Sequence, residues 1–330
     1  MKNTIYIFSG GELKRKQNTI FFETEEGKKF VPVENTSEIM IFGEVTLNKK
    51  LLDFFSQKEI ILHFFNYYGY YSGSYYPREH HNSGYMILKQ AEHYMDPQKR
   101  LVLAKEFVIG SGANLLRNLN YYRNREVEVE PYIEKIEDYQ TRIDEADGVE
   151  KLMALEGNIR EQYYDSFNKI IKSDDFSMEK RTRRPPKNQL NALISFGNSL
   201  IYTTVLSEIY KTHLDPRIGY LHTTNFRSFT LNLDVAEIFK PIITDRLIFS
   251  LTNKGQLQKK HFEEEAGGIL LKEAGRKIFV GTFDERLKQT IQHPSLNRKV
   301  SYRELIRLEL YKLQKHLMEE QKYEPYVLSW

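Results

Sequence analysis

The chain has 330 residues, of which 40% are hydrophobic and 28% are charged, and it carries a formal net charge of +3. Its length predicts two domains, and its apolar runs fall short of the ~20 residues that a membrane-spanning helix needs. Cysteine is absent, which excludes disulfides, cysteine-ligated zinc and thiol nucleophiles. The N-terminus, MKNTIYIFSGG, has no secretory h-region, so we expect a cytoplasmic protein without a membrane partner.

The first expected domain covers residues 1–78 and is rich in β-structure. Short segments with β-branched and aromatic residues alternate with turns that contain glycine or asparagine, a pattern typical of strands and hairpins. Together these segments predict a small twisted β-sandwich. The expected strands are Thr4–Phe8, Thr19–Glu23, Lys29–Pro32, Glu38–Phe42 and Ile60–Phe65, with a short helix over Leu47–Phe55.

A tyrosine-rich stretch, Asn66–Glu79, follows the last of these strands. Tyrosine rings stack on bases, so the stretch could form a nucleic-acid surface. Tyrosine pairs are also favoured in strands or hairpins at protein interfaces. We favour the second interpretation because Arg78 is the only basic residue in the stretch.

In residues 79–330 the spacing of apolar residues changes from two to about 3.6, which predicts helices. Residues 126–147 are acidic with isolated apolar residues, as in a solvated helical face or a mobile connection. The predicted fold class is α+β, with an N-terminal β-sandwich-like domain followed by a larger all-helical domain that carries the candidate site. The expected helices are Tyr85–Tyr94, Arg100–Asn120, Glu150–Ile171, Leu190–Tyr210, Asp234–Thr252, Phe262–Ala274, Phe283–Gln292 and Tyr302–Gln321.

Four residues with metal-binding or acid–base side chains stand out in the second domain: Glu156, His222, Asp234 and Glu237. Asp234 and Glu237 are three residues apart, so on a helix their carboxylates lie on one face. One imidazole nitrogen with several carboxylate oxygens suits Mn²⁺ or Mg²⁺ better than the thiolate-rich sets that zinc often uses. If the fold brings Glu156 to His222 and Glu237, the set predicts a metal site for phosphodiester chemistry.

Each of these residues also has an ordinary structural interpretation. Asp234 and Glu237 resemble an Asp-led capping box that satisfies helix N-terminal amides. Glu156 has Arg160 four residues later, which is typical of a surface ion pair on a helix. His222 could be a hydrogen-bonded histidine in the core. Spacing alone does not decide between these interpretations and a metal site.

Three longer motifs resemble the signature of a known family. They read ALEGNIREQYY at Ala154–Tyr164, RTRRPPKNQLNALISFG at Arg181–Gly197 and GYLHTTNFRSFTLNLDVAE at Gly219–Glu237, in the order of that family. The family is the universal CRISPR-associated integrase, the Cas-one protein, an endonuclease of spacer acquisition. The similarity extends over nearly the whole chain. One position departs from it: Glu237 stands where some relatives have Asp, which keeps the charge and lengthens the side chain.

The resemblance implies that all four residues are catalytic and that Glu156, His222 and Glu237 bind Mg²⁺ or Mn²⁺ directly. Asp234 would be an accessory acidic residue, either beside the ligands or bound to a transient second ion. The implied reaction inserts prespacer DNA into a CRISPR array: a 3′-hydroxyl attacks a phosphodiester, and the 3′-oxygen of the target strand leaves. Because metal binding requires a neutral imidazole, activity should weaken in mild acid.

The same resemblance implies partners. The β-rich domain would form a homodimer, and the Cas-two protein would bridge two homodimers. A Cas-four-type nuclease is a candidate further partner. The substrate would be double-stranded DNA, both as prespacer and as CRISPR repeat, in the cytoplasm of a prokaryote.

Two basic clusters are candidates for contacts to the DNA backbone, although a net charge of +3 does not indicate such contacts by itself. The strongest cluster is Lys180–Lys187, KRTRRPPK, in which arginines could hold phosphates bidentately. The alternative is an ordinary solvated surface. The second cluster contains Lys259 and Lys260. The predicted DNA-binding residues of the two clusters are Arg181, Arg183, Arg184, Lys187, Lys259 and Lys260.

Two other functions fit the same residues. A stand-alone structure-specific DNA nuclease would use the same side chains with water as the nucleophile. A non-catalytic DNA-binding scaffold would use the carboxylates only as helix caps and ion-pair partners. Strand joining distinguishes an integrase from the first. Loss of activity on substitution of Glu156 or Glu237 distinguishes it from the second.

Overall fold

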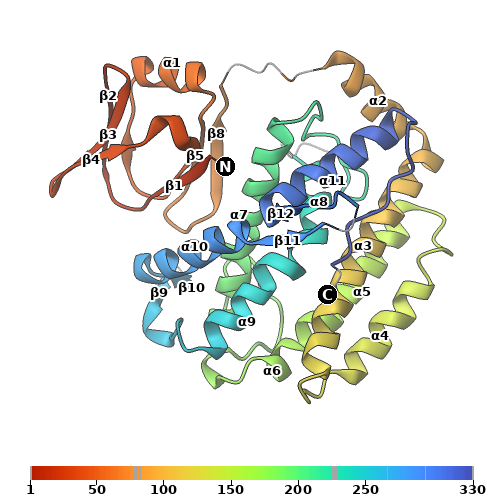
Figure 1. Ribbon diagram of the computed structural model, residues 1–330. Coiled ribbons are helices and arrows are strands. Elements are labelled where there is room, and N and C mark those ends of the chain that lie inside the picture. Colours follow the sequence, from red (N-terminus) through yellow and green to blue (C-terminus); the bar gives the residue numbers. More distant parts are fainter. Residues whose placement is uncertain are drawn as a thin grey trace. The chain divides into compact units, whose positions relative to one another are not determined.

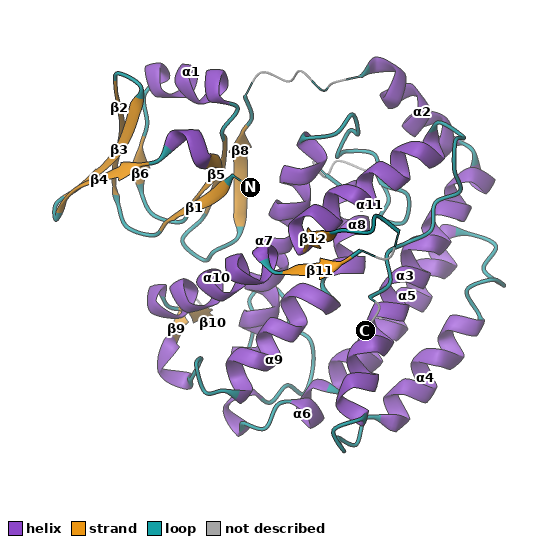
Figure 2. Ribbon diagram, viewed as in Figure 1, coloured by secondary structure: helices purple, strands orange, loops and turns teal. Residues whose placement is uncertain are grey.

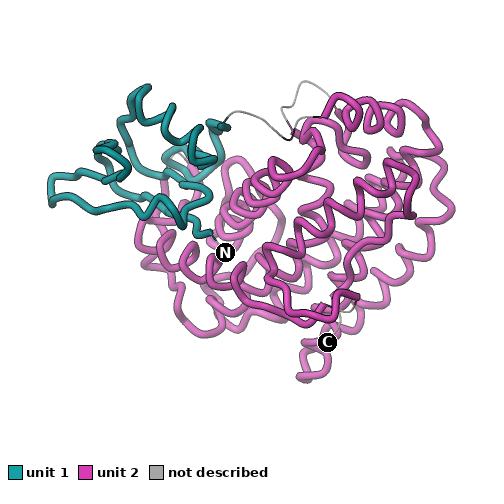
Figure 3. The backbone as a smooth tube through the Cα atoms, turned by 45° about the horizontal axis from the view of Figure 1, so that its top comes forward, with its two compact units in different colours: residues 1–80 teal, residues 81–330 magenta. Residues whose placement is uncertain are grey.

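The computed structural model describes residues 2–77, 81, 83–224, 229–265, 267–293 and 295–328. The chain divides into two compact units, residues 1–80 and residues 81–330, which Figure 3 shows in different colours. The domain boundary expected between residues 78 and 79 lies outside the described residues.

The first unit contains two four-stranded sheets (Figures 1 and 2). One has the strand order β1-β5-β7-β8, in which β1, β5 and β7 are parallel and β8 is antiparallel to β7. The other has the order β4-β3-β2-β6, with antiparallel pairing of β2, β3 and β4. The elements are β1 (Asn3–Ile7), β2 (Gly11–Lys16), β3 (Thr19–Thr24), β4 (Gly27–Val31), β5 (Thr36–Ile41), β6 (Val45–Thr46), α1 (Lys49–Lys58), β7 (Ile61–Phe65) and β8 (Tyr71–Tyr75).

One buried apolar cluster joins both sheets and α1. It includes Leu13 and Ile20 from one sheet, Ile39 and Leu62 from the other, and Phe54 from α1. Successive side chains of a strand point to opposite faces, so each strand contributes one face to this core. The cluster confirms the predicted β-sandwich-like N-terminal domain.

The tyrosine-rich stretch contains a strand. β8 pairs antiparallel with β7, and Tyr71 and Tyr75 on it are partly buried. Tyr67 and Tyr68, in the turn before β8, are 57% and 42% exposed. The strand part of our interpretation is therefore confirmed for residues 71–75, and the protein-interface role stays a prediction. Residues 78 and 79 lie outside the described residues.

The second unit is built mainly from helices (Figure 2). Helix α8 packs against α3 and α7, and α3 also packs against α5, so the helices that carry the candidate site residues are neighbours. This arrangement, with N-terminal sheets and C-terminal helices, confirms the α+β class. The helices are α2 (Gly84–Met95), α3 (Pro97–Arg123), α4 (Glu130–Thr141), α5 (Val149–Asp165), α6 (Phe167–Ile170), α7 (Gln189–Tyr210), α8 (Leu231–Phe239), α9 (Arg246–Asn253), α10 (Glu273–Lys288) and α11 (Tyr302–Leu317).

The second unit is not all-helical, so part of the prediction is wrong. The helix expected over Phe262–Ala274 is replaced by a hairpin, and the helix expected over Phe283–Gln292 ends at Lys288. The four strands involved form two antiparallel pairs: β9 (Phe262–Glu265) with β10 (Gly268–Leu271), and β11 (Thr290–Gln292) with β12 (Lys299–Ser301).

The long helix expected over Asp234–Thr252 is interrupted. Helices α8 and α9 are joined by a π-helical turn, η3 (Pro241–Asp245). Pro241 has no backbone N–H to donate, so a regular α-helical ladder cannot pass through it unchanged. The turn places Asp245 at the N-cap of α9.

The C-terminal segment after α11 folds back on the helical core. Asn114 of α3 donates from Nδ2 to the carbonyl oxygens of Tyr326 at 2.9 Å and Ile238 at 3.1 Å. The N–H of Leu328 donates to Asn114 Oδ1 at 2.9 Å. The described part of the tail is therefore docked beside α8. Among the helices that the structure describes, none is both long and apolar enough to cross a membrane.

Candidate functional site

Asp234 of α8 holds the segment that carries His222. Its carboxylate is fully buried. It accepts hydrogen bonds from three consecutive backbone N–H groups, those of Tyr220, Leu221 and His222, at 2.6, 3.1 and 2.9 Å. Gly219 permits this close approach, because a Cβ there would lie 2.9 Å from Asp234 Oδ2. The carboxylate thereby fixes the path of residues 219–222 against α8.

The capping-box interpretation of Asp234 is wrong. Thr230, not Asp234, is the N-cap of α8, and the Thr230 side chain makes no capping hydrogen bond. The amides that Asp234 satisfies belong to residues 220–222 rather than to its own helix.

Asp234 also orients the imidazole of His222. The ring Nδ1 lies 2.7 Å from Asp234 Oδ1. Because an ionised carboxylate only accepts hydrogen bonds, Nδ1 is the donor, and in the neutral ring Nε2 then has the lone pair. The side chain of His222 is 20% exposed. An imidazole oriented by a carboxylate in this way is the usual arrangement of a metal-binding histidine.

Glu156 and Glu237 share one arginine. Arg160 of α5 donates from Nε to Glu156 Oε1 at 3.4 Å and from Nη2 to Glu237 Oε2. Its Nη2 also lies 3.3 Å from Ser111 Oγ of α3. Arg160 is only 6% exposed, so its pairing with Glu156 is not the surface ion pair that the spacing indicates. Two carboxylates from different helices face one buried cation.

A second cation and a third carboxylate lie beside this group. Lys240 donates from Nζ to Glu237 Oε1 at 2.5 Å and to the Tyr202 hydroxyl at 3.1 Å. Asp245 is buried, and burial raises its pKa to about 6, although the charges of Arg160 and Lys240 oppose this rise. The site is therefore a buried cluster in which carboxylates and cations alternate.

The four predicted residues lie in two adjoining groups. Asp234 binds His222, and Glu156 is linked to Glu237 through Arg160, while Asp234 and Glu237 are three residues apart on α8. Within the described ranges, no three His, Asp or Glu side chains meet at metal-binding spacing. The donor chemistry nevertheless fits a hard divalent cation, since two carboxylates face one cation and an imidazole nitrogen is available nearby.

The chain is similar to known proteins over its whole length. A family model described as CRISPR associated protein Cas1 matches residues 5–285. This chain belongs to the Cas1 family. CRISPR-associated endonuclease Cas1 2 of Thermodesulfovibrio yellowstonii is 62% identical over 330 residues, which are 100% of both chains. CRISPR-associated endonuclease Cas1 of Thermotoga maritima is 52% identical over 96% of this chain and 98% of its own.

Solved structures share the fold. The structure of a Cas1 protein from Thermotoga maritima covers 98% of this chain and 99% of its own, with a TM-score of 0.89 and 51% identity. A casposase bound to integration product has a TM-score of 0.87 at 19% identity and covers 98% of this chain and 93% of its own. A Cas6-RT-Cas1–Cas2 complex has a TM-score of 0.85 at 17% identity and covers 100% of this chain and 36% of its own. The last two show a common fold only.

In this Cas1-family chain, Arg181 is bound to α7 rather than extended into solvent. It donates from Nη1 to Asn191 Oδ1 at 2.9 Å and from Nη2 to Ser195 Oγ at 3.0 Å. Burial lowers its pKa from the ordinary value. Its guanidinium thus anchors the basic loop to the helix next to the site. Three other predicted DNA-binding residues of this loop are exposed: Arg183, Arg184 and Lys187.

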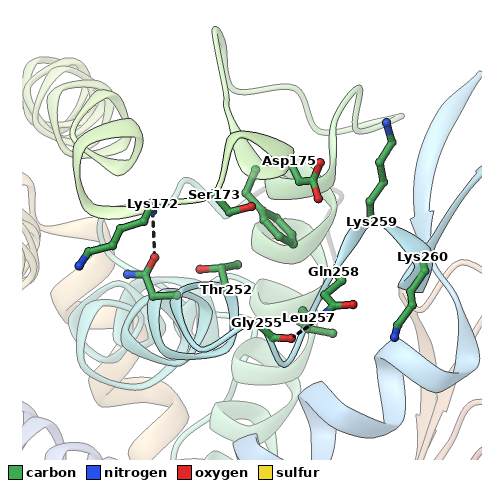
Figure 4. Close-up of a pocket in the computed structure, with 11 residues that line it drawn as sticks. Lys172, Ser173, Asp175, Thr252, Gly255, Leu257, Gln258, Lys259 and Lys260 are labelled. Atoms are coloured by element: carbon green, nitrogen blue, oxygen red, sulfur yellow. Dashed lines mark hydrogen bonds between the residues drawn. The ribbon is translucent and has the colours of Figure 1, made fainter.

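Lys259 and Lys260 line a separate pocket with a volume of about 560 Å³ (Figure 4). Residues that come after α6 in the sequence, including Lys172, form one wall. The end of α9 and the residues after it form the other. All three lysines are exposed, and Asp175 is the acidic residue of the lining. Figure 4 shows the three side chains extending to different sides of the pocket. Such a spread suits an extended polyanion better than a single small anion.

Sequence reasoning did not place Ser111 or Lys240 beside the candidate site, and it did not show that Arg160 is buried there. The sequence does indicate Lys240, because it lies three residues after Glu237, a spacing that places two side chains on one face of a helix. No signal existed for Ser111, because its contact with Arg160 joins α3 to α5. Spacing within one helix does not reveal such contacts.

Proposed function

We propose that this chain is a metal-dependent DNA endonuclease and integrase that inserts prespacer DNA into a CRISPR array. The observation that carries this proposal is the pair of Glu156, which is partly buried, and Glu237, which is buried, around the buried cation of Arg160, together with a histidine oriented by Asp234. The relatives named above carry the name endonuclease and match 100% and 96% of this chain, which supports a nuclease activity here.

Glu156, Glu237 and Nε2 of His222 would hold Mg²⁺ or Mn²⁺. When bound, such a cation polarises the phosphoryl oxygen and stabilises the leaving 3′-oxygen. Asp234 would act as the accessory residue, because its oxygens already accept three backbone N–H bonds and one from the imidazole. Its contribution is to hold His222 in the tautomer that can coordinate.

The remaining side chains would set charge and position at the reacting phosphodiester. Lys240 holds Oε1 of Glu237, which fixes the rotamer of that carboxylate. Arg181, in the loop before α7, is held by Asn191 and Ser195 of that helix, where its charge would attract a phosphate. The DNA itself supplies the nucleophile, a 3′-hydroxyl, and the leaving group, so the protein needs to align both with the phosphate.

A strand-joining assay tests the proposal. The purified chain, a Cas2-type partner and a supercoiled plasmid with a CRISPR repeat would be combined with Mn²⁺, Mg²⁺ or EDTA. We expect joining that EDTA and Glu156→Gln both abolish. Glu161→Gln is the matched control, since Glu161 is an exposed residue of the same helix. Cleavage without joining would favour a stand-alone nuclease, and DNA binding without chemistry in any metal would favour a scaffold.

The partners follow from the same proposal. A homodimer would form through residues 1–78, where the edge strand β4 exposes 78% of Phe30. A Cas2-type protein would bridge two such dimers, and a Cas4-type nuclease stays a candidate partner. Light scattering after gel filtration tests the dimer: Phe30→Glu should yield monomers, and a dimer that survives this change would place the interface elsewhere.

The lysine-lined pocket would contact the DNA backbone outside the reacting phosphodiester. In EDTA, Lys259→Gln with Lys260→Gln should weaken DNA binding and reduce the slope of log Kd against log salt by roughly 1 for each lost phosphate contact. Lys135→Gln on α4, also exposed, is the control. An unchanged slope would contradict a role of this pocket in DNA binding.

A further inference from the structure

Arg160 fills the space between the two proposed glutamate ligands. Its Nε donates to Glu156, and its Nη2 donates to Glu237 and lies near Ser111. A divalent cation held by both glutamates would lie at the same place as this guanidinium. Two positive groups at contact distance repel strongly in a buried site, so they cannot occupy it together. Metal binding therefore requires Arg160 to move.

Two buried polar atoms without hydrogen-bond partners indicate where Arg160 would move. Its own Nη1 and Oδ2 of Asp245 both lack a hydrogen-bond partner among the described residues. The two residues are close enough to interact electrostatically: burial raises the pKa of Asp245, and Arg160 opposes that rise. A buried donor and a buried acceptor that both lack partners are unfavourable unless the two pair in another state of the protein.

Lys240 would not leave in place of Arg160. It binds the other oxygen of Glu237, Oε1, and the hydroxyl of Tyr202 is its second partner. Its side chain is 5% exposed. Displacing Arg160 would free Oε2 of Glu237 and Oε1 of Glu156, so both carboxylates would become available to a divalent cation.

We propose that Arg160 is a positioning residue with two partners: it neutralises the two glutamates while no divalent cation is bound, and it turns to Asp245 when the cation takes its place. The inference rests on the metal site proposed above. In the second position the guanidinium pairs with a buried carboxylate and stays beside the site, where its charge faces an incoming phosphate. Asp245 thus acts on metal binding only through Arg160.

Mn²⁺ binding measured by EPR of the free ion tests this inference without any activity. Arg160→Gln removes the competing cation, so Mn²⁺ should bind at least about 5-fold tighter than to the wild type. Asp245→Asn removes the second partner of Arg160, so Mn²⁺ should bind weaker by a similar factor. In the double variant the effect of Asp245→Asn should disappear, since its effect passes through Arg160.

The opposite signs of the two single substitutions separate this role from a structural one, which would weaken binding in both. An Arg160→Gln variant that binds Mn²⁺ no tighter than the wild type would overturn the inference. So would an Asp245→Asn effect that persists in the double variant, because it would then come from lost charge alone. If Arg160→Gln does not fold by circular dichroism, Arg160→Lys replaces it, with weaker competition and tighter Mn²⁺ binding expected.

Two controls distinguish this inference from the proposed function. Arg142, the C-cap of α4, pairs with Asp138 four residues earlier, as Arg160 does with Glu156, but both of these side chains are exposed. Arg142→Gln should leave Mn²⁺ affinity unchanged. Loss of Mn²⁺ binding in Glu237→Gln supports the metal site itself. A wild type that binds no Mn²⁺ would overturn both, whereas a Glu237-dependent site insensitive to Arg160→Gln would overturn only the inference.

Discussion

Replacement of Asp245 by Asn is expected to stabilise the metal-free protein at neutral pH. Asp245 is 1% exposed, and burial raises its pKa from 3.8 to about 6. The ionised carboxylate is therefore less favourable in the folded protein than in the unfolded chain. The difference between the two pKa values corresponds to about 3 kcal/mol of unfolding free energy. Asn has nearly the same shape without the charge, so it should recover this amount.

The gain must depend on pH. Between pH 3.8 and about 6 the folded protein keeps a proton on Asp245 that the unfolded chain releases, so wild-type stability falls as pH rises through this range. The stability that this proton provides is complete below 3.8 and is lost above about 6. The Asn variant has no such titration. Its advantage should be about 3 kcal/mol at pH 7.5 and about half of that at pH 5.

Urea unfolding in EDTA, followed by circular dichroism at 222 nm, measures this difference, because the described helices lie mainly in residues 81–330. Asp144→Asn is the control, since Asp144 is exposed and its substitution should change stability by less than about 0.5 kcal/mol. The reasoning would be refuted by an Asp245→Asn variant that is no more stable than the wild type. An equal gain at pH 5 and pH 7.5 would refute it as well.

Three further changes have defined outcomes. Asp234→Asn places an amide donor against the N–H groups of residues 220–222, so Mn²⁺ affinity by EPR should fall about 10- to 100-fold; unchanged affinity would contradict the role of Asp234. Gly219→Ala adds a Cβ 2.9 Å from Asp234 Oδ2, so Mn²⁺ binding should weaken while DNA affinity in EDTA stays the same. Glu208→Ala removes the buried partner of Arg307 and Lys211, so urea unfolding should show a loss of about 3–5 kcal/mol; a loss below about 1 kcal/mol would show that these cations find other partners.

Most of the fold follows from patterns that are local in sequence. Segments rich in β-branched and aromatic residues identified β1, β3, β4, β5 and β7 within a few residues. Strand β2, GELKRK, was not predicted. Leu13 is its only buried residue, and with charged residues on both sides of it the strand shows no alternation of apolar and polar residues. The stability of β2 comes from pairing with β3, which no pattern within β2 reveals.

The wrong helix over Phe262–Ala274 shows why short segments are ambiguous. Strands β9 and β10 have four residues each, too few to distinguish a period of two from one of 3.6. The decisive feature is the turn between them. Gly267 has a φ of 70°, a left-handed conformation that glycine adopts easily and that ends a helix. A glycine pair inside an apparent helical pattern was therefore the better guide.

The candidate site was predictable only where its contacts are local. Spacing correctly placed Asp234 and Glu237 on one helix, and Glu156 four residues before Arg160 on another. It could not show that Arg160 reaches Glu237, because this contact joins α5 to α8. Spacing also could not show that Asp234 turns toward residues 219–222, since that depends on the path of a loop.

The structural and functional interpretations of these residues are not exclusive in the folded protein. Asp234 accepts backbone N–H bonds, as a capping carboxylate would, but the amides belong to the segment of His222. Glu156 pairs with Arg160, as its spacing indicates, but the pair is buried against a second carboxylate. In both cases the structural contact is also what orients a proposed metal ligand. A substitution that breaks such a contact must then change metal affinity as well as stability, so metal titration, and not stability alone, separates an enzyme from a scaffold.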